Sequence, residues 1–277
     1  MAELVGAFGV PHMPTTPLAV RQQPNGELAQ LFGGVRQHVD AVNPDVLIVF
    51  DTDHFATWWH QKLPVFAVGV APETSGPGTD DWPGLTAFEH IPVAEDLGRH
   101  LYLCGLDAGF DLTLSEEFGI DHSITVPLEM LNPAMQRPFL PFWINGIAPP
   151  LPLSRRVYAA GQMVSEAINR LPGHVRVGVI ASGAISGDIG GPHNRPGQPS
   201  SPPDEDWVRF AVDCMRAGNV DDLLNAATRD RLQRAGNVTG EILNWLALLG
   251  VVGNRTPCLI EPQMDGGNAY AAWRWDA

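Results

Sequence analysis

Apolar residues along the chain fall into short continuous runs, separated by longer segments with helical spacing. The runs at 4–10, 46–50 and 175–181 predict strands that are covered on both faces, as the strands of a parallel sheet are. Further strands are predicted at 65–70 and 139–147, and one or two short ones within 258–275. Helices are predicted at 27–42, 91–108, 154–171, 206–217, 220–225 and 239–249. This alternation favours an α/β fold in which helices flank a central sheet, mostly parallel or mixed.

Polar, glycine-rich and proline-rich segments mark the predicted breaks. Loops are expected over 71–84 and around Asp121 and His122, and Ser154 is expected to cap the helix that follows it. The glycine-rich stretch 183–191 lacks the G-x-G-x-x-G and G-x-x-x-x-G-K-[ST] patterns, so a nucleotide site is not predicted. Because no segment has the composition of a linker, residues 1–277 are interpreted as a single domain.

Composition and charge exclude several kinds of partner. The chain has 17 basic and 31 acidic residues, a formal charge of -14, and no run of Lys or Arg, so a nucleic-acid partner is not expected. No apolar run approaches the ~18 residues of a membrane span, so no membrane association is expected. The 3 scattered cysteines indicate neither a disulfide framework nor a CxxC metal site, and we expect a reducing, cytoplasmic location.

Three ionisable residues are predicted to reach one shared cleft. His12 follows the first strand, His54 follows the buried strand at 46–50, and Glu241 lies near the start of a late helix. Groups at the carboxyl ends of strands mark the binding edge of open α/β sheets. Two imidazoles and one carboxylate form the facial triad that holds Fe(II) in non-haem oxygenases, although zinc accepts the same ligands.

Each of the three residues also has a simpler structural interpretation. His12 lies in a Pro-His-Met-Pro stretch and is compatible with a turn residue. His54 follows Asp53, and such a pair is often only a hydrogen bond between neighbours. Glu241 is compatible with a favourable charge in the first turn of a helix. The metal site is favoured by the combination of the three residues.

Four segments, in order along the chain, carry a family resemblance. They are Gly-Val-Pro-His-Met-Pro at 9–14, the run 44–50 that leads to Asp53-His54, Gly-Ile-Asp-His-Ser at 119–123 with Val-Pro-Leu at 126–128, and Glu-Ile at 241–242 before Trp245. Together they resemble the class III extradiol ring-cleavage dioxygenases, the family of the protocatechuate 4,5-dioxygenase catalytic subunit. The similarity spans residues 5 to about 250, most of the chain.

The resemblance implies roles for the candidate residues. It implies that His12, His54 and Glu241 bind Fe(II), and that His122 lies in the active site near the substrate. An imidazole there is suited to deprotonating a catecholic hydroxyl or handling protons during the reaction. The alternative is that His122 is a structural residue paired with Asp121. The resemblance also implies a homo-oligomer, or a heteromer with a small partner subunit.

One departure from the family pattern concerns the acid/base residue. After the strand at 175–181 the family usually reads Gly-x-Ser-His, and that His is its principal acid/base catalyst, whereas Gly187 stands at this position here. Glycine has no side chain that exchanges a proton. His193, six residues further on, is a candidate catalytic residue for the same cleft, and Asp188 is nearer in the chain.

The sequence therefore predicts a non-haem Fe(II) dioxygenase that opens the ring of a catechol-like, aminophenol-like or hydroxypyridone-like aromatic with dioxygen. Manganese and zinc remain alternatives to iron. Because of Gly187, a metal-dependent hydrolase or C–C lyase on the same fold is a second hypothesis. A non-catalytic scaffold that keeps the metal ligands is a third.

Overall fold

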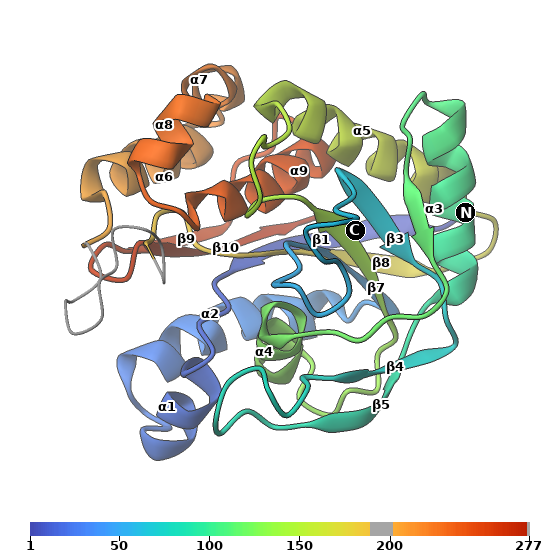
Figure 1. The fold of residues 1–277 in the computed structure, drawn as a ribbon, viewed down its shortest axis with the longest axis horizontal. Helices are drawn as coiled ribbons and strands as arrows, with labels where there is room; N and C mark the ends of the chain where they lie inside the picture. The colour runs from blue at the N-terminus through green and yellow to red at the C-terminus, as the bar shows by residue number, and fades with distance from the viewer. Residues whose placement is uncertain (189–201, 276–277) are drawn as a thin grey trace.

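The computed structural model describes residues 1–188 and 202–275, and its centre is one eight-stranded sheet (Figure 1). The strand order is β6-β3-β7-β2-β8-β1-β10-β9. The strands are β1 (Glu3–Val10), β2 (Val46–Asp51), β3 (Phe66–Gly69), β6 (Thr113–Ser115), β7 (Phe139–Ile144), β8 (Arg176–Ser182), β9 (Leu259–Gln263) and β10 (Asn268–Arg274). This mixed sheet with flanking helices confirms the predicted fold class, while the assignment of all 277 residues to one catalytic domain stays a prediction.

The four strands at the centre of the sheet, β7, β2, β8 and β1, run parallel. Every residue of β2 and β7 is buried, which explains why these strands read as continuous apolar runs instead of alternating ones. Parallel strands end at the same edge of the sheet, so the segments that follow β1, β2 and β8 emerge side by side. His12 and His54 follow β1 and β2 at this edge, and Glu241 faces both of them.

Helices cover both faces of the sheet (Figure 1). Helices α2 (Glu27–Val42) and α4 (His122–Leu131) pack on one face, and α5 (Ser154–Arg170) and α9 (Ile242–Val252) on the other. The remaining helical segments are α1 (Thr16–Gln22), α3 (Glu95–Asp107), α6 (Glu205–Ala217), α7 (Val220–Ala226), α8 (Arg229–Arg234) and the 3-10 turn η1 (Thr239–Glu241). Apolar side chains fill the space between sheet and helices on each face and form two core clusters.

A second sheet of two strands lies beside α4 (Figure 1). It pairs β4 (Glu73–Gly76) with β5 (Phe88–Pro92), and residues 77–87 connect the two strands. The prediction that 71–84 holds no regular element was therefore wrong. β4 has only four residues and few apolar ones, and its hydrogen bonds go to a strand more than ten residues away, so local patterning gave no signal for it.

Several predicted boundaries also change. α3 begins at Glu95 and not at residue 91, because residues 91 and 92 belong to β5. Leu153 is the N-cap of α5, so the prediction for Ser154 was wrong; the Ser154 hydroxyl donates to the carbonyl of Leu224 instead. His122 begins helix α4, where a loop was expected. Among the described residues, no helix is long and apolar enough to cross a membrane.

Candidate metal centre and active site

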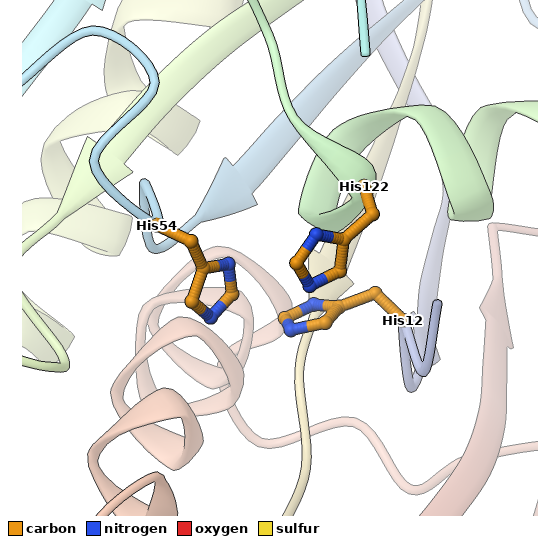
Figure 2. A group of neighbouring side chains, drawn as sticks. All are labelled: His12, His54 and His122. Carbon is orange, nitrogen blue, oxygen red and sulfur yellow. The ribbon is translucent and has the colours of Figure 1, made fainter. Parts of the chain in front are cut away.

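The candidate site lies at the carboxyl edge of the parallel strands, where segments from distant parts of the chain meet (Figure 2). His12 comes two residues after β1 and His54 three residues after β2. His122 is the first residue of α4, and Glu241 is the last residue of η1 and the N-cap of α9. The structure thus brings together four of the five residues that the sequence singled out.

The two predicted histidine ligands converge on one carboxylate oxygen. Glu241 Oε1 lies 3.3 Å from His12 Nε2 and 3.2 Å from His54 Nε2. The His12 and His54 rings meet edge to face with centroids 5.1 Å apart. His122 completes the group: one ligand atom from each of the three histidines lies within 4.8 Å of the others. His12 and Glu241 are buried, and His54 and His122 are partly exposed.

The backbone that follows β8 fixes the side chain of Glu241. Its Oε2 accepts a 2.7 Å hydrogen bond from the amide of Ala184. Gly183 has φ +145°, and a Cβ at this position would lie 2.6 Å from the Glu241 Cβ. Only glycine accepts both this backbone conformation and this close approach. Oε2 is therefore occupied by the protein, and Oε1 points to the two imidazoles.

The start of α9 is fixed by two buried polar side chains further along the helix. Asn244 Nδ2 donates to the carbonyl of Ser182 at 2.7 Å, and Trp245 Nε1 donates to the carbonyl of Gly183 at 2.9 Å. The Trp245 ring also packs against Gly9 in β1, where a Cβ would lie 2.1 Å from it. These contacts join α9 to the ends of β8 and β1, and so set the position of Glu241 relative to His12.

The hydrogen bonds of His12 define its tautomer. Ser182 Oγ donates to the carbonyl of Ser123 at 2.5 Å, and His12 Nδ1 lies 2.8 Å from the same hydroxyl oxygen. Because the single hydroxyl proton is used by the carbonyl, His12 Nδ1 is the donor in the second bond. Nε2 of the neutral ring then presents a lone pair toward Glu241. Burial lowers the pKa of His12, against the opposing effect of the Glu241 carboxylate, and so favours this neutral ring.

His54 is placed between two carboxylates. Its amide donates to Asp121 Oδ2 at 2.6 Å, and its Nδ1 lies 3.8 Å from Asp121 Oδ1, while Nε2 faces Glu241. Burial opposes a charge on His54, but Asp121 and Glu241 outweigh it and raise the pKa of His54 well above its ordinary value. The earlier alternative, a simple pair with Asp53, was wrong: Asp53 accepts from the amides of Thr57 and Trp58.

The three ligand atoms fit a divalent metal. Although burial disfavours the charged carboxylate, His12 and His54 outweigh it and hold the pKa of Glu241 well below its ordinary range, so the group is an anion. His12 Nε2 and Glu241 Oε1 are therefore two acceptors only 3.3 Å apart, an arrangement that calls for a cation between them. In the metal-free protein the proton on His54 supplies part of this charge. A metal ion takes its place when bound.

His122 has a different carboxylate partner from the predicted one. Asp121 turns its side chain to the amide of Ser123 as the N-cap of α4, and Asp81 accepts from His122 instead. Asp81 Oδ1 lies 2.6 Å from His122 Nδ1, and Oδ2 accepts from the His122 amide at 2.7 Å. The His122 ring lies nearly parallel to that of His54, with centroids 4.8 Å apart. The alternative that His122 is structurally paired with Asp121 was therefore wrong.

The buried carboxyl group of Asp51 is connected to the site through Ser123 and Asp121. Asp51, at the end of β2, is fully buried, and its Oδ2 lies 2.8 Å from the Ser123 hydroxyl oxygen. The same hydroxyl contacts Asp121 Oδ1, so one serine joins two carboxyl groups. Burial and the nearby Asp121 charge raise the pKa of Asp51 well above its ordinary value. A protonated Asp51 supplies the second proton that this three-residue chain needs.

Gly187 contacts the segment that precedes Glu241 and contributes no side chain to the site. Its amide faces Thr239 Oγ1 at 3.4 Å, its carbonyl accepts from the amide of Val238, and a Cβ here would lie 2.9 Å from Val238 Cγ2. Asp188 Oδ1 accepts from the Asn237 amide at 3.3 Å and lines a cavity with Val238 that none of the four site residues borders. His193 lies outside the described residues.

Sequence reasoning missed three residues that support the site: Asp81, Ser182 and Asn244. Ser182 and Asn244 had a weak signal, since one directly follows the predicted strand at 175–181 and the other lies about one helical turn after Glu241. Asp81 had none, because it lies 41 residues from His122 in a segment that was expected to be irregular.

Comparison with known proteins shows the family of this chain. Residues 6–264 match the family of the catalytic LigB subunit of aromatic ring-opening dioxygenase. The match covers nearly the whole chain, so this protein belongs to that family, as the resemblance predicted.

Curated relatives carry the name 2,3-dihydroxyphenylpropionate/2,3-dihydroxicinnamic acid 1,2-dioxygenase. The protein from Mycobacterium sp. (strain MCS) is 34% identical over 178 residues, which are 62% of this chain and 54% of that protein. The protein from Azotobacter vinelandii (strain DJ / ATCC BAA-1303) is 25% identical over 276 residues, 84% of this chain and 85% of that protein. The chain spans about half the length of the first relatives that it matches.

A solved structure shares the fold. An uncharacterized protein from Escherichia coli K12 superposes with a TM-score of 0.55 over 97% of this chain and 98% of that one, at 14% sequence identity. This likeness supports the arrangement of sheet and helices.

Proposed function

We propose that this protein is an Fe(II)-dependent extradiol dioxygenase that opens the ring of a catechol-like aromatic with dioxygen. The observation that carries the proposal is the convergence of His12 Nε2, His54 Nε2 and Glu241 Oε1 at the carboxyl edge of the sheet. Family membership supports it, and so do the names of the curated relatives.

The donor set suits iron. Two imidazoles and one carboxylate are the ligands of mononuclear non-haem Fe(II) in oxygenases. When bound, such an iron holds an aromatic diol and dioxygen together and transfers electron density between them. The chain's own contribution is to keep three donors in register: Ser182 fixes the His12 ring, Asp121 holds the His54 segment, and the Ala184 amide holds Glu241.

His122 is the residue that would handle protons. Its Nδ1 is bonded to Asp81, and its Nε2 lies on the side of the other two histidines (Figure 2). A neutral imidazole beside the site accepts a proton from a catecholic hydroxyl as the diol binds, and returns it later in the turnover. In this proposal His122 is a catalytic residue and not a metal ligand.

The substrate class follows from the ligands and the relatives. An aromatic with two adjacent donors, such as a diol, an aminophenol or a hydroxypyridone, chelates a metal that has three protein ligands. The relatives' names point to the diol. We also propose that the enzyme acts as a homo-oligomer, or with a small partner subunit.

Gly187 favours a second candidate. A chain without an acid/base side chain at this position is also compatible with metal-dependent hydrolysis or C–C cleavage that uses no oxygen, with zinc or manganese in the same site. Oxygen consumption separates the two functions.

The test is anaerobic loading with Fe(II), followed by oxygen-electrode traces with a panel of catechols, aminophenols and hydroxypyridones. We expect one dioxygen consumed per aromatic and a yellow ring-opened product. Turnover of a substrate without oxygen uptake would support the hydrolase or lyase. Tight metal binding with no turnover of any kind would support a non-catalytic relative.

A further inference from the structure

The carboxylate of Asp81 accepts two hydrogen bonds from His122, one from the ring and one from the backbone. Oδ1 lies 2.6 Å from the ring Nδ1, and Oδ2 accepts from the backbone amide at 2.7 Å. Both side chains are largely buried, with 11% of Asp81 and 15% of His122 exposed. These are short bonds of the charge-assisted kind, which are stronger and more directional than neutral ones.

The double contact selects one tautomer of His122. An ionised carboxylate only accepts hydrogen bonds, so His122 Nδ1 must carry a proton to bond with it. Nε2 of the neutral ring is then left with a lone pair, on the side that faces His12 and His54 (Figure 2). Because His122 is also the first residue of α4, its backbone is fixed and the ring has little freedom to turn.

The segment that carries Asp81 is anchored on several sides. Residues 77–87 connect β4 to β5, and Arg21 of α1 donates to the carbonyl of Gly84 at 3.0 Å and to Thr86 Oγ1 at 3.2 Å. The same guanidinium donates to Glu129 of α4 at 2.9 Å. Arg21 therefore joins the segment of Asp81 to the helix of His122, which keeps the two partners in register.

The site offers no other imidazole for proton transfer among residues 1–188 and 202–275. His12 and His54 are the proposed metal ligands, and His122 is the third histidine of the group. The proton work of the proposed reaction then depends on one ring, and that ring works only with Nε2 unprotonated.

We propose that Asp81 is a positioning residue that keeps His122 in the Nδ1-protonated tautomer, so that Nε2 accepts the substrate proton. This inference rests on the proposed function for its kinetic consequence, but not for the tautomer itself. Asp81 contacts neither the metal ligands nor the reacting atoms and acts only through His122.

The Asp81→Asn variant separates this role from simple anchoring. Its amide oxygen still accepts from the His122 backbone, but its NH₂ group then faces Nδ1 and donates to it, which forces the proton onto Nε2. A residue that only anchors the segment keeps its function in this variant. A tautomer-fixing residue loses it, as happens when the orienting Asp of a catalytic triad is changed to Asn. Asp80→Asn is the matched control, since it removes the same charge from an exposed neighbouring residue.

Two measurements test the proposal on the whole chain. In the zinc-loaded protein, the ¹⁵N shifts of His122, assigned by their absence in His122→Gln, should show Nδ1–H in the wild type and in Asp80→Asn, and Nε2–H in Asp81→Asn. In the iron-loaded enzyme, kcat of Asp81→Asn should fall by about 10²–10⁴-fold. Iron content and KM should stay within about twofold of the wild type, because the tautomer affects the chemical step and not ground-state binding.

The outcomes distinguish the inference from the function on which it rests. An unchanged tautomer or a wild-type kcat in Asp81→Asn would overturn the inference, even if the wild type opens rings. Loss of iron in Asp81→Asn would also overturn it, because Asp81 would then act through a metal ligand. If the wild type consumes no oxygen, the proposed function fails, whereas an inverted tautomer in Asp81→Asn still supports the positioning role.

Discussion

His12 and His122 are held in similar ways by very different parts of the molecule. Each bonds through Nδ1 and leaves Nε2 facing the site. The partner of His12 is Ser182, at the end of the adjacent central strand, with its proton committed to a buried carbonyl. The partner of His122 is Asp81, in the long connection of the two-stranded sheet. One histidine is thus positioned by the core of the fold and the other by a peripheral segment.

This difference separates the site into two halves. The proposed metal half consists of His12, His54 and Glu241. Its supports are strand ends, the amide after Gly183, α9, and Asp121 at the N-terminus of α4. Its geometry is set by packing that also stabilises the protein. The His122 half depends on α4, residues 77–87 and a half-exposed Arg21. Changes there are expected to alter catalysis while the fold and the metal stay in place.

The largest effect is expected from Gly183→Ala, which changes the backbone beside Glu241 in the metal half. The new Cβ overlaps Glu241, and the backbone conformation is strained as well. We expect metal affinity to fall by more than about 100-fold, since loss of a supporting residue alone costs 10–100-fold. Gly173→Ala is the control, because it also has a positive φ (+94°) but no atom within 4 Å of a Cβ. It should cost about 1 kcal/mol of stability and leave metal binding unchanged. Equal metal affinity in the two variants would contradict the account.

Ser182→Ala removes the acceptor that fixes the His12 ring. We expect metal affinity to fall by about 10–100-fold, measured by competition with a chelator, because the ring then loses its preferred tautomer and orientation. Ser186→Ala is the control: this buried serine, four residues further on, bonds to the carbonyl of Ala235 and not to His12. A Ser182→Ala protein that holds metal as tightly as the Ser186→Ala protein would show that the tautomer of His12 does not matter.

Metal binding should release a proton, and the charge state of the metal half gives the sign. In the free protein the pKa of His54 is raised, so the ring is protonated at pH 7, while the pKa of His12 is lowered and that ring is neutral. Glu241 is already ionised. Binding therefore displaces about one proton, and apparent affinity should rise about tenfold per pH unit until the pH passes the pKa of His54. Calorimetry in buffers of different ionisation enthalpy measures this number, and a value near zero would contradict the assignment of His54.

The smallest effect is expected from Arg21→Ala in the His122 half. Exposed ion pairs contribute about 0.2–1 kcal/mol, so kcat should fall by less than about fivefold, with iron content unchanged. The matched control is Arg99→Ala, which breaks surface pairs with Glu95 and Glu116 on another part of the molecule. If Arg21→Ala lowered iron content instead of kcat, the two halves would not be independent.

The sequence predicted the metal half much better than the His122 half, and the reason is physical. Buried parallel strands read as apolar runs, so the ends that carry His12 and His54 could be located from the pattern alone. Glu241 was placed at a helix start by the same reasoning, with help from the family resemblance. The wrong partners for His54 and His122 came from assuming that neighbours in sequence bond to each other.

Asp121 illustrates why that assumption fails. As the N-cap of α4 it turns toward the Ser123 amide, and this brings its other oxygen to the amide of His54, 67 residues away. The next residue, His122, consequently points elsewhere and meets Asp81. Such pairings depend on how two sheets and a helix pack in three dimensions, and local spacing does not encode them.

The central claim is that Glu241 binds the metal and His122 does not. It is tested most directly by the iron retained per chain after anaerobic Fe(II) loading and desalting of the wild type, Glu241→Ala and His122→Ala. We predict about one iron per chain in the wild type and in His122→Ala, and little in Glu241→Ala, as expected for a triad of two histidines and one carboxylate. Iron retained by Glu241→Ala and lost from His122→Ala would contradict the claim, and would assign the metal to the three histidines instead.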